Sequence, residues 1–141
     1  MRENNTLAKN TQISVVDDDA SMRQAINTLI SSIGFNVAEF LSAEDFLNAG
    51  EFDDIDCLIL DVRMPGLDGL ELQRRLNAAD IKTPIVFITA HYSEEQRRTA
   101  ITAGAVAFLR KPFTEQELLD AIDASLAIRS KGADRLDEER D

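Results

Sequence analysis

Short apolar runs alternate with longer stretches of helical period along most of the chain. In the first such stretch, apolar residues recur at intervals of three and four, as at Met22, Ile26 and Leu29, which is the spacing of one helix face. The apolar runs predict five strands, at residues 12–17, 36–40, 57–60, 84–89 and 106–109. A helix is predicted after each strand, including residues 43–49 after the second strand and 93–103 after the fourth.

Polar residues at the expected helix starts support this assignment. Either Asp19 or Ser21 suits the cap of the first helix, and Ser42 suits the cap of the second. Thr114 precedes the last helix, and Glu117 stands three residues later, which is the spacing of a capping box. The pattern therefore predicts where the helices begin as well as how many there are.

Strands that alternate with helices are typical of a parallel sheet with right-handed crossovers and helices on both faces. The run 57–60 is almost continuously apolar, as expected of a strand that is covered on both sides. The predicted fold class is therefore α/β, a doubly wound parallel sheet. We expect one domain at residues 12–128, a polar and disordered lead-in at 1–11, and a frayed charged tail at 129–141.

The composition narrows the classes of function. The chain has 141 residues and a formal net charge of -11, which disfavours direct binding of nucleic acid because such binding needs a basic surface. Its one cysteine, Cys57, cannot form an internal disulfide and is expected to be a buried apolar residue in a reducing compartment. No secretory signal and no apolar run of membrane-spanning length is visible, so we expect a cytoplasmic protein without membrane contact.

Polar residues stand where the predicted strands end. Asp17 and Asp18 end the first strand, Asp61 ends the third, Thr89 ends the fourth, and Lys111 follows the fifth. The carboxyl ends of parallel strands share one edge of the sheet, and ligands bind there. If the strand order is 2-1-3-4-5, the first and third strands are neighbours, and the three carboxylates converge.

Converging carboxylates repel one another, and a divalent cation relieves that repulsion. Since all the candidate ligands are oxygens, the pattern points to a hard ion such as Mg²⁺, which binds one or two carboxylates together with phosphate oxygens. Lys111 and the hydroxyl of Thr89 could hold further phosphate oxygens. The site is therefore predicted to handle a phosphoryl group, with Asp61 as a suitable acceptor.

Several motifs in this order and spacing resemble receiver domains of response regulators in two-component signalling. They cover nearly the whole chain, from about residue 12 to residue 128, and are Val15-Val16-Asp17-Asp18-Asp19, the run from Leu58 to Gly69, Ile88-Thr89-Ala90, Gly104-Ala105 and Lys111-Pro112-Phe113. The resemblance implies a flavodoxin-like (βα)5 fold with strand order 2-1-3-4-5. It also implies a phosphoacceptor signalling domain rather than an enzyme with an external substrate.

The resemblance also implies a role for each matching residue. Asp61 matches the phosphoacceptor. Asp18 and Asp61 match direct magnesium ligands, Asp17 assists partly through water, and the main-chain carbonyl of Arg63 matches the remaining protein ligand. Mn²⁺ is expected to substitute for Mg²⁺.

Further residues match the switching parts of such domains. Thr89 matches the hydroxyl that moves toward the phosphate, Lys111 the phosphate-binding lysine, and Phe108 the aromatic side chain that turns inward. The bond before Pro112 resembles one that is cis in the family. The implied output is a change in the face formed by the fourth helix, the fifth strand and the fifth helix.

Arg63 and His91 each stand two residues after a site residue, and we expect them to tune the lifetime of the phosphoryl group. Plainer interpretations remain for three residues: Asp19 as a helix cap, Phe108 as a core aromatic, and His91 as polar surface.

The implied partners are a sensor histidine kinase or a phosphotransfer protein and a downstream output protein. The segments at 104–109 and 89–91 are most similar to receivers of the nitrogen-fixation regulator type, which usually carry a helix-turn-helix output domain. This chain has no such domain after residue 128, so it is either a single-domain regulator or the receiver part of a longer one. A phosphorylation-dependent homodimer is a further expectation, although Gln96-Arg97-Arg98-Thr99 makes the fourth helix unusually polar.

Two rival interpretations stay open. The first is a phosphatase of the haloacid dehalogenase type that begins at Asp17-Asp18-Asp19, but this needs a later acidic pair at a strand end, and Asp120 and Asp123 fall in the last helix. It also leaves Asp61 without a role. The second is a degenerate receiver that only binds protein, although no residue of the site is missing.

Overall fold

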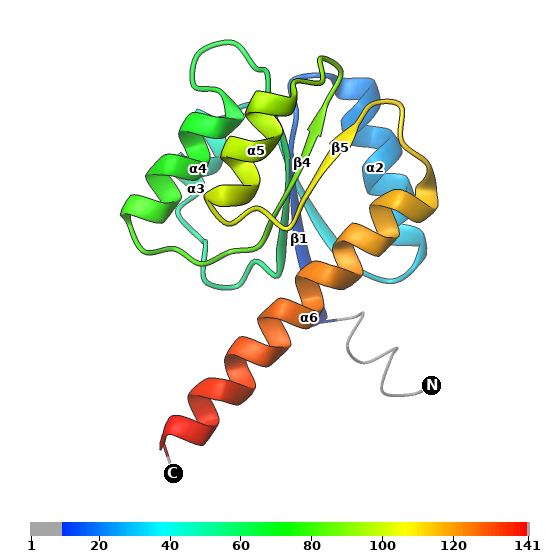
Figure 1. The fold of residues 1–141 in the computed structure, drawn as a ribbon. Helices are drawn as coiled ribbons and strands as arrows, with labels where there is room; N and C mark the ends of the chain where they lie inside the picture. Colours follow the sequence, from blue (N-terminus) through cyan, green and yellow to red (C-terminus); the bar gives the residue numbers. More distant parts are fainter. Residues whose placement is uncertain (1–9, 141) are drawn as a thin grey trace.

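The computed structural model describes the backbone of residues 10–140 and the side chains of residues 10–129 (Figure 1). Within them, five parallel strands form one sheet in the order β2-β1-β3-β4-β5. The strands are β1 (Gln12–Val16), β2 (Asn36–Phe40), β3 (Cys57–Asp61), β4 (Ile85–Thr89) and β5 (Ala107–Arg110). The predicted class and strand order are thereby confirmed, and each strand lies within about two residues of its predicted range.

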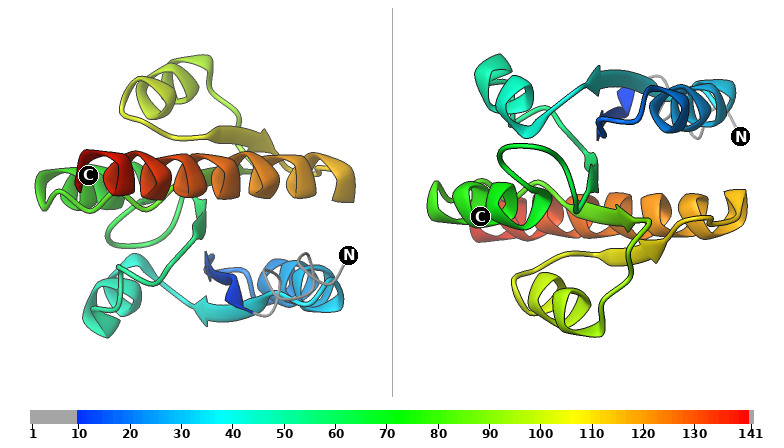
Figure 2. Two further views of the ribbon diagram at one scale, coloured as in Figure 1. Left: turned by 90° about the horizontal axis from the view of Figure 1, so that it is seen from below. Right: turned by 90° about the horizontal axis from the view of Figure 1, so that it is seen from above.

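Helices cover both faces of the sheet, as Figure 2 shows in views along the strands. Helices α2 and α6 pack on one face, and α3, α4 and α5 pack on the other. They are α2 (Ala20–Ser32), α3 (Ala43–Ala49), α4 (Gly69–Ala78), α5 (Glu94–Thr102) and α6 (Glu115–Arg140). This arrangement is the flavodoxin-like doubly wound fold.

Successive residues of each strand enter opposite halves of the core. On β3, Leu58 and Leu60 pack with the α3, α4 and α5 side, whereas Cys57 and Ile59 pack with the α2 and α6 side. All five residues of β3 and all five of β4 are buried, because these strands lie inside the sheet. The edge strands β2 and β5 are partly exposed, so the sequence shows weaker apolar runs there.

The side chains at the helix starts act as the sequence predicted. Asp19 rather than Ser21 caps α2, with its carboxylate accepting hydrogen bonds from two main-chain N–H groups. Ser42 caps α3. Thr114 and Glu117 form the reciprocal hydrogen bonds of a capping box.

The two ends of the domain differ from their expected form. Thr11, assigned to the lead-in, is buried, and its carbonyl accepts a hydrogen bond from the N–H of Asn36; residues 1–9 of the lead-in lie outside the described part. At the other end, α6 continues to Arg140 through residues expected to form a frayed tail (Figure 1). That segment contains arginine, lysine and glutamate, which favour helix, and lacks proline.

No helix in the described part of the chain is both long enough and apolar enough to cross a bilayer.

Candidate functional site

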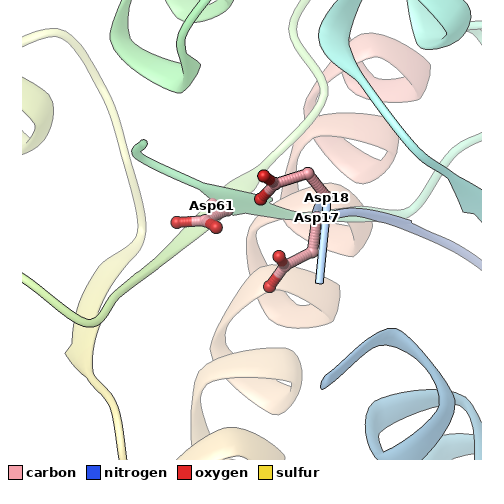
Figure 3. A group of neighbouring side chains, drawn as sticks. All are labelled: Asp17, Asp18 and Asp61. Carbon is pink, nitrogen blue, oxygen red and sulfur yellow. The ribbon is translucent and has the colours of Figure 1, made fainter. Parts of the chain in front are cut away.

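Three carboxylates meet at the carboxyl ends of β1 and β3. The parallel register pairs Val16 with Leu60, so the residues that follow, Asp17 and Asp61, come out side by side at the same sheet edge. With Asp18, each contributes a carboxylate oxygen to a group whose atoms all lie within 4.8 Å of one another (Figure 3). The convergence predicted from the strand order is therefore present.

The cluster is only partly open to solvent. Asp17 is fully buried and Asp61 is 5% exposed, whereas Asp18 is exposed. The ammonium of Lys111 lies 2.9 Å from Oδ2 of Asp17 and 3.5 Å from Oδ2 of Asp61. One cation thus faces two buried carboxylates, which leaves the group with surplus negative charge.

The pKa values of Asp61 and Lys111 reflect this surplus of negative charge. Burial, and then the neighbouring charge of Asp17, raise the pKa of Asp61 to about 7, against the opposing effect of Lys111. For Lys111, burial acts to lower the pKa, but the hydrogen bond to Asp17 and the charges of both aspartates outweigh burial and raise it. Lys111 therefore stays protonated, and the carboxylates still repel each other.

Thr89 lies at the end of β4, and Lys111 follows the end of β5, so both lie near the cluster. Thr89 is fully buried, and its hydroxyl accepts a hydrogen bond of 3.1 Å from the N–H of His91. The N–H of Lys111 donates to the carbonyl of Thr89 at 2.7 Å. The bond between Lys111 and Pro112 is cis.

Arg63 and His91 lie at the rim of the site, and both side chains are exposed. The N–H of Arg63 donates to Oδ1 of Asp61 at 3.2 Å, which resembles the contact between His91 and Thr89. Both residues are therefore tied through their main chain to a buried site residue, while their side chains face solvent.

Phe108 lies farther from the cluster, on β5. Its ring centroid is 5.9 Å from that of Phe87 and 5.9 Å from that of Tyr92, with the Tyr92 ring nearly perpendicular. The guanidinium carbon of Arg110 lies 4.3 Å from the ring centroid of Tyr92, in a cation–π contact. Phe108 is thus half-buried between the core and an exposed aromatic–cation stack.

Two contacts that hold the loop after Asp61 have no motif in the sequence. A Cβ on Gly69 would lie 2.3 Å from the carbonyl oxygen of Asp61, so only glycine lets the start of α4 approach the strand end so closely. Glu44 of α3 accepts a hydrogen bond of 3.0 Å from the N–H of Leu67. Gly69 ends the motif that begins at Leu58, but the sequence does not show why glycine is needed there, and it gives no sign of Glu44.

The donor set fits a magnesium ion. All the ligand atoms are oxygens, the carboxylates are gathered without enough cations to neutralise them, and one of them is exposed on the open side. By contrast, a hollow of about 530 Å³ at the opposite ends of the strands, beside Gln12, Ser14 and Asp56, holds none of these residues.

Comparison with known proteins agrees with this geometry. Residues 13–123 match the response regulator receiver domain family. The transcriptional regulatory protein TdiR of Thauera aromatica is 41% identical over 126 residues, which cover 89% of this chain and 56% of TdiR. Nodulation protein W of Bradyrhizobium diazoefficiens is 47% identical over 111 residues, covering 79% of this chain and 49% of that protein.

Solved structures show the same relationship. The response regulator StyR superposes with a TM-score of 0.86 at 42% identity, covering 93% of this chain and 66% of that chain. Full-length FixJ from B. japonicum gives a TM-score of 0.81 at 39% identity, covering 89% of this chain and 62% of that chain. The chain therefore belongs to the response regulator receiver domain family, and the FixJ-like character predicted from its motifs is confirmed.

Receiver domains are signalling domains that bind Mg²⁺ at an aspartate cluster, and here that cluster is Asp17, Asp18 and Asp61. The chain spans about half the length of the curated relatives it matches.

Replacing Asp61 with asparagine should stabilise the metal-free fold. The pKa of Asp61 is raised from 3.8 to about 7 in the folded state, so the ionised group destabilises the fold, and stability is lost as the pH rises from about 4 to about 7. In EDTA at pH 7.5 we expect the free energy of unfolding of Asp61→Asn to be about 1–2 kcal/mol higher than that of the wild type. The difference should shrink at pH 4.5, as measured by denaturant unfolding.

Asp123→Asn is the matched control, since Asp123 is exposed on α6 and should change stability by less than about 0.5 kcal/mol. A difference between wild type and Asp61→Asn that is absent at pH 7.5, or that does not change with pH, would contradict the assigned repulsion.

Proposed function

We propose that this domain accepts a phosphoryl group on Asp61 from the phosphohistidine of a sensor kinase or phosphotransfer protein, in a reaction that needs Mg²⁺. The observation that carries the proposal is the group of three carboxylates within 4.8 Å, with the single ammonium of Lys111 beside it. A site with this charge balance binds a divalent cation and, through it, an anionic group.

The transfer is a single displacement. A carboxylate oxygen of Asp61 attacks phosphorus, a P–O bond forms while the P–N bond to the donor imidazole breaks, and the product is an acyl phosphate. Asp18, Asp61 and the main-chain carbonyl of Arg63 would hold the magnesium ion, with Asp17 assisting. The bound ion supplies neutralisation of charge on the phosphoryl oxygens. Manganese has the same preference for oxygen ligands and should substitute.

Two residues are proposed to bind the remaining phosphoryl oxygens. The ammonium of Lys111 is already oriented toward the site by Asp17, so little side-chain freedom has to be lost when it binds phosphate. The hydroxyl of Thr89 accepts a hydrogen bond from His91 and keeps its own proton for donation to a phosphate oxygen. Both groups stabilise the charge that Asp61 would carry as an acyl phosphate.

The new charge is proposed to act on the face formed by α5, β5 and α6. When Thr89 moves toward the phosphate, it frees space that Phe108 can enter by leaving Tyr92. Among the residues of α5, only Ala100 is buried, and the buried Oε1 of Gln96 has no hydrogen-bond partner in the described part of the chain. The polar sequence at residues 96–99 thus goes with weak packing of this helix, and we propose that α5 can shift when the phosphoryl group is present.

The face that changes would then contact an output domain, an output protein or a second phosphorylated copy. Phosphorylation shifts this equilibrium only by the difference in its interaction with the two states. The rival phosphatase function lacks support, because Asp120 and Asp123 lie along α6 rather than at a strand end.

Intact mass after incubation with acetyl phosphate tests the proposal. The wild type should gain one phosphoryl group in Mg²⁺ and none in EDTA, and Asp61→Asn should gain none, because the accepting oxygen is lost. The control Asp123→Asn should behave as the wild type. Absence of a mass gain under every condition, or turnover of a generic phosphate ester, would refute the proposal.

We further propose that Arg63 and His91 tune the lifetime of the acyl phosphate by limiting the approach of water. Their side chains flank the site from two loops and are exposed. Changing either to alanine should speed dephosphorylation several-fold at constant Mg²⁺, measured as decay of the phosphorylated mass. Lys82→Ala, whose side chain is 82% exposed on another loop, should leave the rate unchanged. Equal rates in all four proteins would remove the assigned role.

A further inference from the structure

The carboxylate of Asp18 has no partner of its own in the part of the chain that the structure describes. Asp17 is held by Lys111 and by the N–H of Asp19, and Asp61 is held by Lys111 and the N–H of Arg63. Asp18 is exposed and makes neither a hydrogen bond nor an ion pair, yet it extends toward Asp61 (Figure 3). Its direction must therefore come from the main chain that carries it.

The main chain at Asp17 is held on both sides of its Cα by contacts from other elements. The N–H of Asp17 donates to the carbonyl of Phe40 on β2 at 3.2 Å. The carbonyl of Asp17 accepts a hydrogen bond of 2.6 Å from Nη1 of Arg23 on α2. Because that carbonyl belongs to the peptide that leads into Asp18, the Arg23 guanidinium sets the plane from which the Asp18 side chain projects.

Arg23 is itself held in place. Its side chain is only 11% exposed, and its Nε lies 3.3 Å from a carboxylate oxygen of Glu39 on β2. The other oxygen of Glu39 accepts a hydrogen bond of 2.5 Å from the amide of Asn27. The planar guanidinium thus joins α2, the end of β1 and the edge strand β2, a geometry that lysine cannot reproduce with a single ammonium.

We propose that Arg23 is a positioning residue for the cation site, which it serves by holding the Asp17–Asp18 peptide so that the Asp18 carboxylate faces Asp61. This inference rests on the proposed function, because it assigns Asp18 to the magnesium ion. Arg23 touches neither the three carboxylates of the cluster nor the phosphoryl group, so its effect is on the affinity of the site for the ion. Once the ion is bound, the transfer itself should be little altered.

The ion pair with Glu39 does not explain the burial of Arg23. The Glu39 side chain is 30% exposed, and ion pairs open to solvent contribute little to stability. The hydrogen bond from a guanidinium to a half-buried carbonyl is charge-assisted and stronger. The two contacts of the same side chain can therefore be separated experimentally, one by changing Arg23 and one by changing Glu39.

The experiment is a calorimetric Mg²⁺ titration of the full chain for wild type, Arg23→Met, Arg23→Lys and Glu39→Gln. We expect Arg23→Met to weaken binding about tenfold and Arg23→Lys several-fold, because lysine keeps the charge without the two-sided contact. Glu39→Gln, which removes the ion pair and leaves the contact with Asp17, should stay within about twofold of the wild type. Denaturant unfolding of each protein in EDTA gives its metal-free stability.

Two further measurements distinguish a positioning role of Arg23 from a general loss of structure. The rate of phosphorylation by acetyl phosphate should return to the wild-type value in Arg23→Lys at saturating Mg²⁺. In metal-free protein, the backbone amide signal of Asp18 in a ¹⁵N spectrum should move in Arg23→Lys and not in Glu39→Gln. If Arg23→Met does not fold, Arg23→Lys carries the same comparison.

Unchanged Mg²⁺ affinity in a folded Arg23 variant, with normal binding by the wild type, would overturn this inference alone. An equal loss in Glu39→Gln would also overturn it, because the effect would then belong to the ion pair. A wild-type protein that binds no Mg²⁺ would instead overturn the proposed function from which the inference starts.

Discussion

Mutual repulsion among carboxylates at the ends of β1 and β3 is the constraint around which the site is organised. In a parallel sheet, adjacent strands end at the same edge, so the register of Val16 with Leu60 brings Asp17 and Asp61 together. Asp17 is fully buried and Asp61 nearly so, which strengthens the repulsion because little water screens it. Every residue of β3, which carries Asp61, and of the neighbouring β4 is buried, and this packing holds the charges in place.

Other parts of the site reduce the effect of that repulsion. Lys111, delivered by the end of β5, neutralises part of the charge, and Gly69 lets the positive end of α4 approach the Asp61 main chain. The balance that is left suits one divalent cation, and a phosphoryl group brings further negative charge to the same place. We propose that such a domain responds to phosphorylation because an acyl phosphate on Asp61 would change the balance of charge between the carboxylates and Lys111.

The sequence was sufficient for the sheet, the capped helices and the five polar residues at the ends of four strands. Those features follow from local periodicity and from the rule that parallel strands end at one edge. It was not sufficient for the roles of Gly69, Glu44 and Arg23: Gly69 stands in a quoted motif, but all three roles arise from distances between elements that the sequence does not show. Helix α6 continues to Arg140, past the boundary expected at residue 128, because a charged segment has no apolar period by which its helix could be recognised.

Binding of Mg²⁺ to the wild type and to Asp18→Asn, measured by titration calorimetry at neutral pH, tests the central claim most directly. We expect one ion per wild-type chain, and strongly weakened binding when the Asp18 carboxylate is removed, since that side chain makes no hydrogen bond or ion pair with the described residues and remains available to the ion. An exposed change such as Asp123→Asn should not alter binding. Saturable binding that is the same in Asp18→Asn, or no saturable binding by the wild type, would contradict the claim that the repelling carboxylates form a cation site.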